Sequence, residues 1–121
     1  MRVKYQSETP WQFELGDFLA ERGLVYTDVT EVVMYVKNDP TDADGSALFN
    51  KTYTGGDITW NDDNDALIVD INSSDYGSGK MEIDGSYYVY IGLTAAGYTG
   101  VYLEPELRTH VIDVFQDGIR S

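Results

Sequence analysis

The sequence has no cysteine, little positive charge and no long apolar run. The absence of cysteine excludes a disulfide framework, a thiolate zinc site and a thiol nucleophile, and it leaves the redox compartment undetermined. No stretch approaches the roughly 18 apolar residues of a membrane-spanning helix, and the N-terminus lacks the apolar segment of an export signal. We therefore expect a soluble protein that does not enter a membrane.

Positive charge is scarce, because eight Lys and Arg stand against 21 Asp and Glu, for a formal net charge of −13. Such a surface repels the phosphate backbone of nucleic acids and the anionic surface of a bilayer. We expect neither as a partner. The charge leaves two interpretations open, which are solubility alone or a specific basic or metal partner.

What the chain does contain favours a folded β domain. With 42% hydrophobic and 13% aromatic residues, disorder is not expected. Ten Tyr stand among Val, Ile and Thr, which suit half-buried strands, and 12 Gly punctuate the sequence between them. We expect one domain over residues 11–115, an N-terminal arm over residues 1–10 and a C-terminal tail over residues 116–121. Such arms either dock on a neighbouring protein or fray.

Alternating apolar and polar residues, separated by turn signals, predict a series of short strands. Residues 18–23 are expected to form a short helical turn or a loop, and residues 25–30 a short strand or a connection. The pattern is typical of an all-β, immunoglobulin-like antiparallel sandwich of about seven or eight short strands, with at most one short helical turn. The predicted strands are 11–15, 31–37, 47–53, 58–60, 66–71, 87–94, 99–103 and 107–115, with 58–60 and 66–71 forming a hairpin.

The acidic turn at residues 61–65 is the best candidate for a metal site. Asn61, Asp63 and Asp65 fit the first three ligand places of a calcium loop. Ala66 stands where that loop needs Gly, and Asn72 where it needs Glu. We expect a solvated hairpin turn, with a weak calcium site as the alternative, and no cofactor.

No motif for catalysis is present. The sequence lacks a Gly-x-Ser-x-Gly elbow and a phosphate-binding Gly loop. His110 is the single histidine, and strand alternation puts it on one face with Ile112 and Val114. We expect a structural or surface histidine and a protein that is not an enzyme.

The aromatic residues offer candidates for contact with another protein. In the strand over residues 87–94, Tyr88 and Tyr90 share one face while Tyr87, Val89 and Ile91 share the other, so one face belongs to the core. Tyr and Trp are favoured in protein interfaces, and a sugar-stacking platform or simple core packing are the alternatives. The candidate contact residues are Trp60, Tyr88, Tyr90 and Trp11.

The order of segments resembles the immunoglobulin-like N-terminal domain of tailed-phage upper baseplate proteins and related short stand-alone phage structural proteins. The resemblance lies in a strand ending in Val-Lys, an acidic loop, an Ala-Leu-x-x-Lys-Thr strand, a Gly-Gly turn, a Ser/Asp-rich linker and a Tyr-rich strand. The matching residues are 26–37 for the strand ending in Val-Lys, 44–52 for the Ala-Leu-x-x-Lys-Thr strand, 55–60 for the Gly-Gly turn and 85–93 for the Tyr-rich strand. Residues 111–114, in the last predicted strand, also match.

The resemblance implies a virion protein without enzymatic activity that acts as an assembly module in the tail, neck or baseplate. Its partners would be other virion proteins, and it would form a homo-oligomer in a ring or on a shell. A capsid decoration protein is the alternative placement, and a host-surface sugar-binding module is a further hypothesis.

Overall fold

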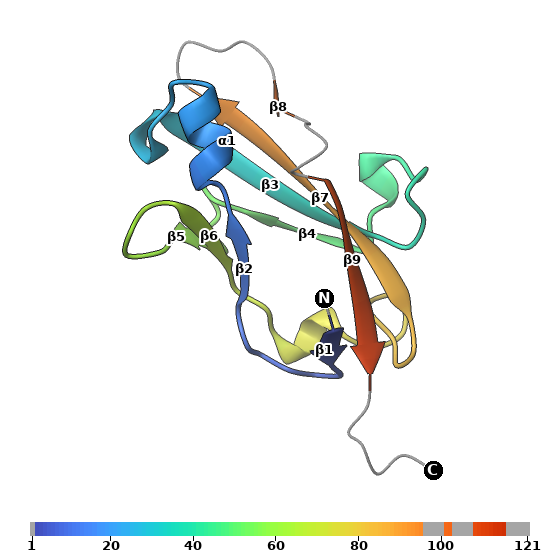
Figure 1. The fold of residues 1–121 in the computed structure, drawn as a ribbon. Helices are drawn as coiled ribbons and strands as arrows, with labels where there is room; N and C mark the ends of the chain where they lie inside the picture. The colour runs from blue at the N-terminus through green and yellow to red at the C-terminus, as the bar shows by residue number, and fades with distance from the viewer. Residues whose placement is uncertain (1, 96–100, 103–107, 116–121) are drawn as a thin grey trace.

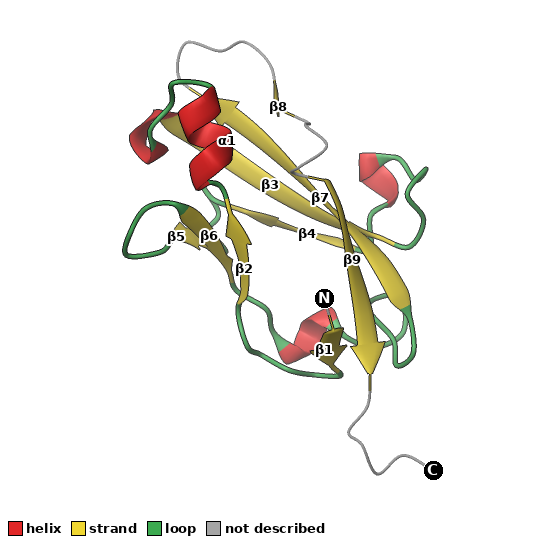
Figure 2. Cartoon of the chain, viewed as in Figure 1, coloured by secondary structure: helices red, strands yellow, loops and turns green. Residues whose placement is uncertain are grey.

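A computed structural model shows a sandwich of two β-sheets, which confirms the predicted fold class (Figures 1 and 2). The structure describes residues 2–95, 101–102 and 108–115, with the backbone alone at residues 101–102 and 108–111. The strands are β1 (Arg2–Lys4), β2 (Trp11–Glu14), β3 (Val29–Lys37), β4 (Phe49–Thr52), β5 (Ile58–Trp60), β6 (Ala66–Val69), β7 (Ser86–Ala95), β8 (Val101–Tyr102) and β9 (Arg108–Phe115).

The helical elements are short. One α-helix, α1 (Gly16–Glu21), follows β2, and three 3₁₀ turns are η1 (Tyr26–Asp28), η2 (Asp44–Ser46) and η3 (Ser73–Asp75). Phe18 and Leu19 bury one side of α1, and Gly23, with a φ of 67°, lies just beyond its end in the left-handed region that favours glycine. In Figure 1 α1 and η1 lie at one end of the sandwich and η3 lies beside β1 at the other.

The large sheet has the strand order β1-β9-β7-β3-β4, with β8 pairing β7, and the small sheet has the order β2-β6-β5. The order β9-β7-β3-β4 corresponds to strands G-F-C-C′ of a variable-type immunoglobulin domain, and β2-β6-β5 to strands B-E-D. Neighbouring strands are antiparallel except β1, which runs parallel to β9. The predicted hairpin of β5 and β6 is confirmed, with Trp60 opposite Leu67.

The core lies between the sheets, where the period-two pattern of each strand places its apolar side chains. Tyr87, Val89 and Ile91 of β7 point inward, and Tyr88 and Tyr90 are half-exposed on the outer face, as the alternation predicted. The large side chains that are completely or almost completely buried include Leu15, Met34, Ile58, Leu67, Met81, Ile91, Leu93 and Ile112.

A second immunoglobulin feature stands at the start of β7. The Glu82 backbone N–H donates to Tyr87 Oη at 2.7 Å, five residues upstream of the buried ring. This is the arrangement called a tyrosine corner, which joins the connection before strand F to the core. The Tyr87 ring lies so close to Gly85 that a side chain at position 85 has no room.

The N-terminal segment lies on the domain. Beyond β1, the residues that lead to β2 contact η3 and its surroundings through three interactions. The Tyr5 ring lies edge-on to the Tyr76 ring with centroids 5.5 Å apart, Tyr76 Oη donates to the Ser7 carbonyl at 2.9 Å, and the Ser73 N–H donates to Glu8 Oε2 at 3.1 Å. The expected tail, residues 116–121, lies outside the described residues.

Candidate functional site

The candidate site lies where α1, η1 and the β5–β6 hairpin meet, and we call it the Trp60 corner, defined by Leu24, Val25, Tyr26 and Trp60. Val25 is 58% exposed and Tyr26 38%, and within the described residues they are the exposed large apolar side chains. The Tyr26 ring packs edge-on against the Trp60 ring, with centroids 5.9 Å apart. An exposed apolar group fixed on a rigid base is a common contact point for another molecule.

Local hydrogen bonds hold these side chains outward. Asp28 accepts the Val25 N–H through its carboxylate and donates its own N–H to the Val25 carbonyl, both at 2.9 Å. The Leu24 N–H donates to the Leu19 carbonyl at 2.9 Å, which joins the turn to α1. The short polar turn satisfies its backbone internally, so Val25 and Tyr26 are presented without a frayed loop.

The corner borders a cavity of about 380 Å³ with walls of opposite character. Leu19, Leu24 and Val25 provide apolar lining, and Asp63 and Asp65 of the hairpin turn line the other side. Apolar lining beside carboxylates suits a ligand that combines an apolar side chain with a Lys or Arg. Trp60 is half-buried beside Tyr26, and its indole N–H is buried without a hydrogen-bond partner in the described part of the chain.

The turn that carries the metal candidates is closed by its own hydrogen bonds. Asn61 Oδ1 accepts the N–H groups of Asp65 and Ala66 at 3.0 Å, and Asn61 Nδ2 donates to Asp65 Oδ1 at 2.8 Å. Asn64 adopts the left-handed conformation, with a φ of 56°. The Asn61 oxygen is therefore committed to the turn, and Asp63 remains exposed. In residues 2–95 and the other described positions, no three His, Asp or Glu side chains gather as metal ligands.

Tyr88 and Tyr90 lie on the outer face of the large sheet, but Tyr90 is already engaged within the chain. Its hydroxyl donates to the Pro40 carbonyl at 3.1 Å, and Lys37 Nζ lies 4.7 Å from its ring centroid. Lys37 in turn donates to Asp44 Oδ1 at 2.7 Å. The connection between β3 and β4 thus occupies part of this face, so the Trp60 corner is the more accessible aromatic surface.

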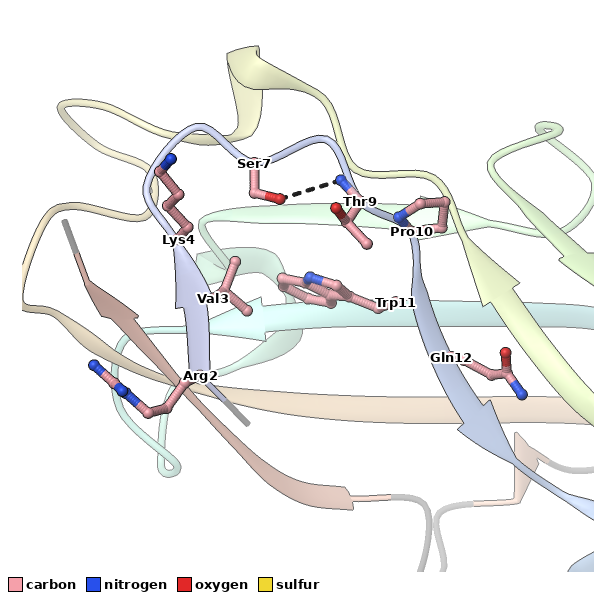
Figure 3. Close-up of a pocket in the computed structure, with 8 residues that line it drawn as sticks. All are labelled: Arg2, Val3, Lys4, Ser7, Thr9, Pro10, Trp11 and Gln12. Atoms are coloured by element: carbon pink, nitrogen blue, oxygen red, sulfur yellow. Dashed lines mark hydrogen bonds between the residues drawn. The ribbon is translucent and has the colours of Figure 1, made fainter. Parts of the chain in front are cut away.

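Trp11 is not a surface residue, which corrects its selection as a contact candidate. Its side chain is 4% exposed because β2 turns Trp11 and Phe13 toward the core, where their rings pack edge-on with centroids 6.5 Å apart. Figure 3 shows Trp11 and Val3 pointing toward each other between β1 and β2, beside a cavity of about 290 Å³. The Trp11 indole N–H also has no partner among the residues described.

The backbone of His110 lies in β9 opposite Val89, and its side chain is outside the described part of the structure. Sequence reasoning missed a buried ion pair instead. Lys51 Nζ of β4 lies 2.7 Å from Asp75 Oδ2 of η3, with both side chains at most 10% exposed. The Asn72 N–H also donates to Asp75 Oδ2, at 2.8 Å.

Tyr76, next to this ion pair, has a perturbed hydroxyl. Burial, with the negative charge of Asp75 as a second cause, raises the pKa of Tyr76 to about 12. The only sequence signal for this arrangement is one Lys in an otherwise apolar strand face, and the sequence does not say which of 21 acids pairs with it.

No protein-family model matches the chain, and no curated protein or solved structure is similar enough to count as a match. Within the described residues, no helix is long and apolar enough to cross a membrane.

Proposed function

We propose that the chain is a non-enzymatic structural protein of a bacteriophage particle, acting as an assembly module in the tail, neck or baseplate. Two lines support this proposal. The order of its sequence segments resembles that of phage baseplate immunoglobulin-like domains, and its immunoglobulin-like sandwich suits a rigid module.

The observation that carries the proposal is the exposure of Val25 and Tyr26 on a rigid end of the sandwich. The neighbouring cavity is lined by apolar side chains and by Asp63 and Asp65. A partner surface that inserts one apolar side chain and places a Lys or Arg near the hairpin turn would match both features. With a net charge of −13, the chain itself is short of such cations, so the partner at this corner is another virion protein with a basic contact surface.

The alternative placement is a decoration protein on the outer capsid shell. An acidic sandwich suits that role as well, and the same corner would then face the major capsid protein. The two placements differ in copy number, because a ring or baseplate holds few copies and a shell holds many.

The test is quantitative mass spectrometry of purified particles of the phage that encodes the chain, scaled to the major capsid protein. Tens of copies or fewer support a tail, neck or baseplate position. Hundreds of copies identify a decoration protein. Absence from the particle overturns both placements, and a glycan array with Trp60→Ala and Tyr88→Ala variants would then test sugar binding.

A further inference from the structure

Strand β2 has one unpaired edge. It pairs with β6 on one side, and no described strand lies on the other. In an immunoglobulin sandwich, strand A commonly occupies this place beside strand B. Here the N-terminal strand β1 pairs with β9 in the large sheet instead, so the small sheet ends at β2.

The pairing register identifies which backbone groups face this open edge. The Leu15 N–H donates to the Asp65 carbonyl at 2.8 Å, directly after the Glu14–Ala66 pair of the ladder. Alternate residues of an antiparallel strand bond to the same neighbour, so Trp11, Phe13 and Leu15 bond to β6. The N–H and C=O groups of Gln12 and Glu14 therefore point to the open edge.

The bonds on the far side of β6 lead to the same assignment. The Asn61 N–H donates to the Ala66 carbonyl at 3.0 Å, and the Asp70 N–H donates to the Asp57 carbonyl at 2.8 Å. The even-numbered residues of β6 thus bond to β5, which leaves Leu67 and Val69 for Phe13 and Trp11.

This edge lacks the usual protection against pairing. Proteins commonly block an exposed edge with Pro, with several charges or with a bulge. Pro10 precedes β2 and leaves the N–H groups of Gln12 and Glu14 intact, β2 pairs with β6 without a bulge, and Glu14 is the one charged residue within the strand. The cavity of about 290 Å³ between β1 and the start of β2 leaves space beside the edge (Figure 3).

We propose that β2 is a self-association edge, which pairs antiparallel with β2 of a second copy of the chain around a two-fold axis at Phe13. Gln12 then lies opposite Glu14 of the second copy, and Glu14 lies opposite Gln12 of the second copy. Each pair exchanges two backbone hydrogen bonds, and each exposed Gln side chain, which donates to Glu14 Oε1 of its own chain at 3.1 Å, meets a second carboxylate across the contact. The two small sheets become one continuous six-stranded sheet, and the contact is closed by its two-fold symmetry.

The alternative registers are poorer. A shift that places the two Glu14 residues opposite each other sets like charges directly across the strand pair, which is destabilising. A shift in the other direction places Pro10, which has no N–H, opposite Glu14 and removes a hydrogen bond on each side. Side-chain complementarity therefore selects the second copy as occupant and selects the register.

The test is sedimentation equilibrium of the full chain over a wide concentration range, at physiological ionic strength, where screening weakens the repulsion between two acidic chains. We expect a reversible monomer–dimer equilibrium. Gln12→Glu places carboxylates opposite each other in both pairs and should weaken the dimer roughly tenfold. Gln12→Lys should strengthen it. Combining Gln12→Glu with Glu14→Lys restores opposite charges in both pairs and should recover the dimer.

A backbone variant tests the same contact independently of charge. Gln12→Pro removes an N–H that faces the open edge and none that bonds to β6, so it should abolish the dimer, while the matched Gln12→Ala retains it. Circular dichroism and thermal melting establish that each variant is folded, and the three charge variants decide the question if Gln12→Pro does not fold.

A chain that stays monomeric at every concentration overturns the proposal. So does a dimer that responds equally to Gln12→Glu and Gln12→Lys, since another surface must then form it. The inference does not depend on a place in a virion, because particle composition and solution dimerisation are measured separately.

Discussion

The two ends of the sandwich treat similar side chains in opposite ways. At the end that carries η3, the Tyr76 hydroxyl donates to Ser7, the Tyr5 and Tyr76 rings pack together, and Lys51 forms an ion pair with Asp75. At the end that carries α1 and η1, Val25 and Tyr26 are exposed. At the first end, which we call the closed end, these polar groups bond to partners within the chain. At the Trp60 corner, apolar side chains remain exposed.

This difference shows that residue type alone does not identify a contact surface. Tyr90 and Tyr26 are both tyrosines that are not buried, yet Tyr90 donates to Pro40 within the chain and Tyr26 lies on an open corner. Internal partners stabilise the fold, whereas uncovered apolar surface remains available to another molecule. Mutations at the closed end should therefore change stability, and mutations at the Trp60 corner should change assembly.

The largest expected effect is at the closed end. Lys51→Met leaves the Asp75 carboxylate buried without its cation and should lower the free energy of unfolding by about 3–5 kcal/mol. Denaturant unfolding followed by circular dichroism measures the change. Replacing both partners, with Lys51→Met and Asp75→Leu, should recover much of the loss, because no unpaired charge then remains in the interior.

Lys37→Met is the matched control on the neighbouring strand. The Lys37 side chain is as buried as that of Lys51, but its partner Asp44 is 59% exposed. Water can solvate that carboxylate once the cation is gone, so we expect a loss of about 1 kcal/mol or less. Equal losses for the two variants would contradict the assignment of Lys51 and Asp75 as a buried pair.

The hairpin turn beside the Trp60 corner should give the next largest effect. Asn61→Ala removes three side-chain hydrogen bonds from the turn and should lower the free energy of unfolding by about 1–3 kcal/mol. Asp63→Ala, at an exposed position of the same turn, is the control and should change it little.

Differential scanning calorimetry with millimolar calcium should show no shift in Tm, and a clear upward shift would establish the metal site.

Tyr76→Phe should have a smaller effect with a distinct dependence on pH. Loss of the hydrogen bond to Ser7 should cost about 1 kcal/mol at neutral pH. The folded state raises the pKa of Tyr76 from 10.0 to about 12, so it favours the neutral phenol. That contribution is complete below pH 10 and is lost as the pH rises from 10 to 12.

Unfolding measured across this alkaline range should therefore show a steeper loss of stability in the natural chain than in Tyr76→Phe. Tyr88→Phe, which removes the hydroxyl of a tyrosine on the outer face, is the matched control. Parallel curves for the natural chain and Tyr76→Phe would disprove that the raised pKa of Tyr76 contributes to stability.

A small effect on stability should come from the Trp60 corner itself. Val25→Ser combined with Tyr26→Ser should lower the free energy of unfolding by about 1 kcal/mol, because the Tyr26 ring loses its edge-on packing against Trp60. If the corner binds a virion partner, the same variant should be depleted from particles about tenfold or more, because apolar anchors dominate interface energies. Thr41→Ser, an exposed change in the connection between β3 and β4, should be incorporated normally, and normal incorporation of the double variant would remove the corner from the assembly model.

Local pattern was sufficient for much of the fold. The alternation in β7 correctly divided Tyr87, Val89 and Ile91 from Tyr88 and Tyr90, because successive side chains of a strand point to opposite faces. The acidic turn correctly predicted the hairpin of β5 and β6. The ambiguous residues 25–30 divide between η1 and the start of β3, since local hydrogen bonding by Asp28 competes with strand pairing.

Local pattern could not distinguish the two tryptophans. Trp11 and Trp60 both occupy short strands of the small sheet and both contact the core, but Trp11 is buried, whereas Trp60 is only partly buried and packs beside Tyr26. Their environments depend on which elements cover each end of the sheet. In the same way, the pairing of Lys51 with Asp75 joins two segments that are separated by β5 and β6 in the chain.

The sequence by itself determined the strands, the side chains that face inward and the acidic surface, because these depend on composition and on a repeat of two residues. Tertiary structure alone decided which strand edges are paired, which aromatic rings are covered and which charges meet. Those outcomes depend on the order of strands within each sheet, and β1 illustrates the reason. By pairing with β9 instead of β2, it extends the large sheet and leaves β2 as an edge strand of the small sheet among the described residues.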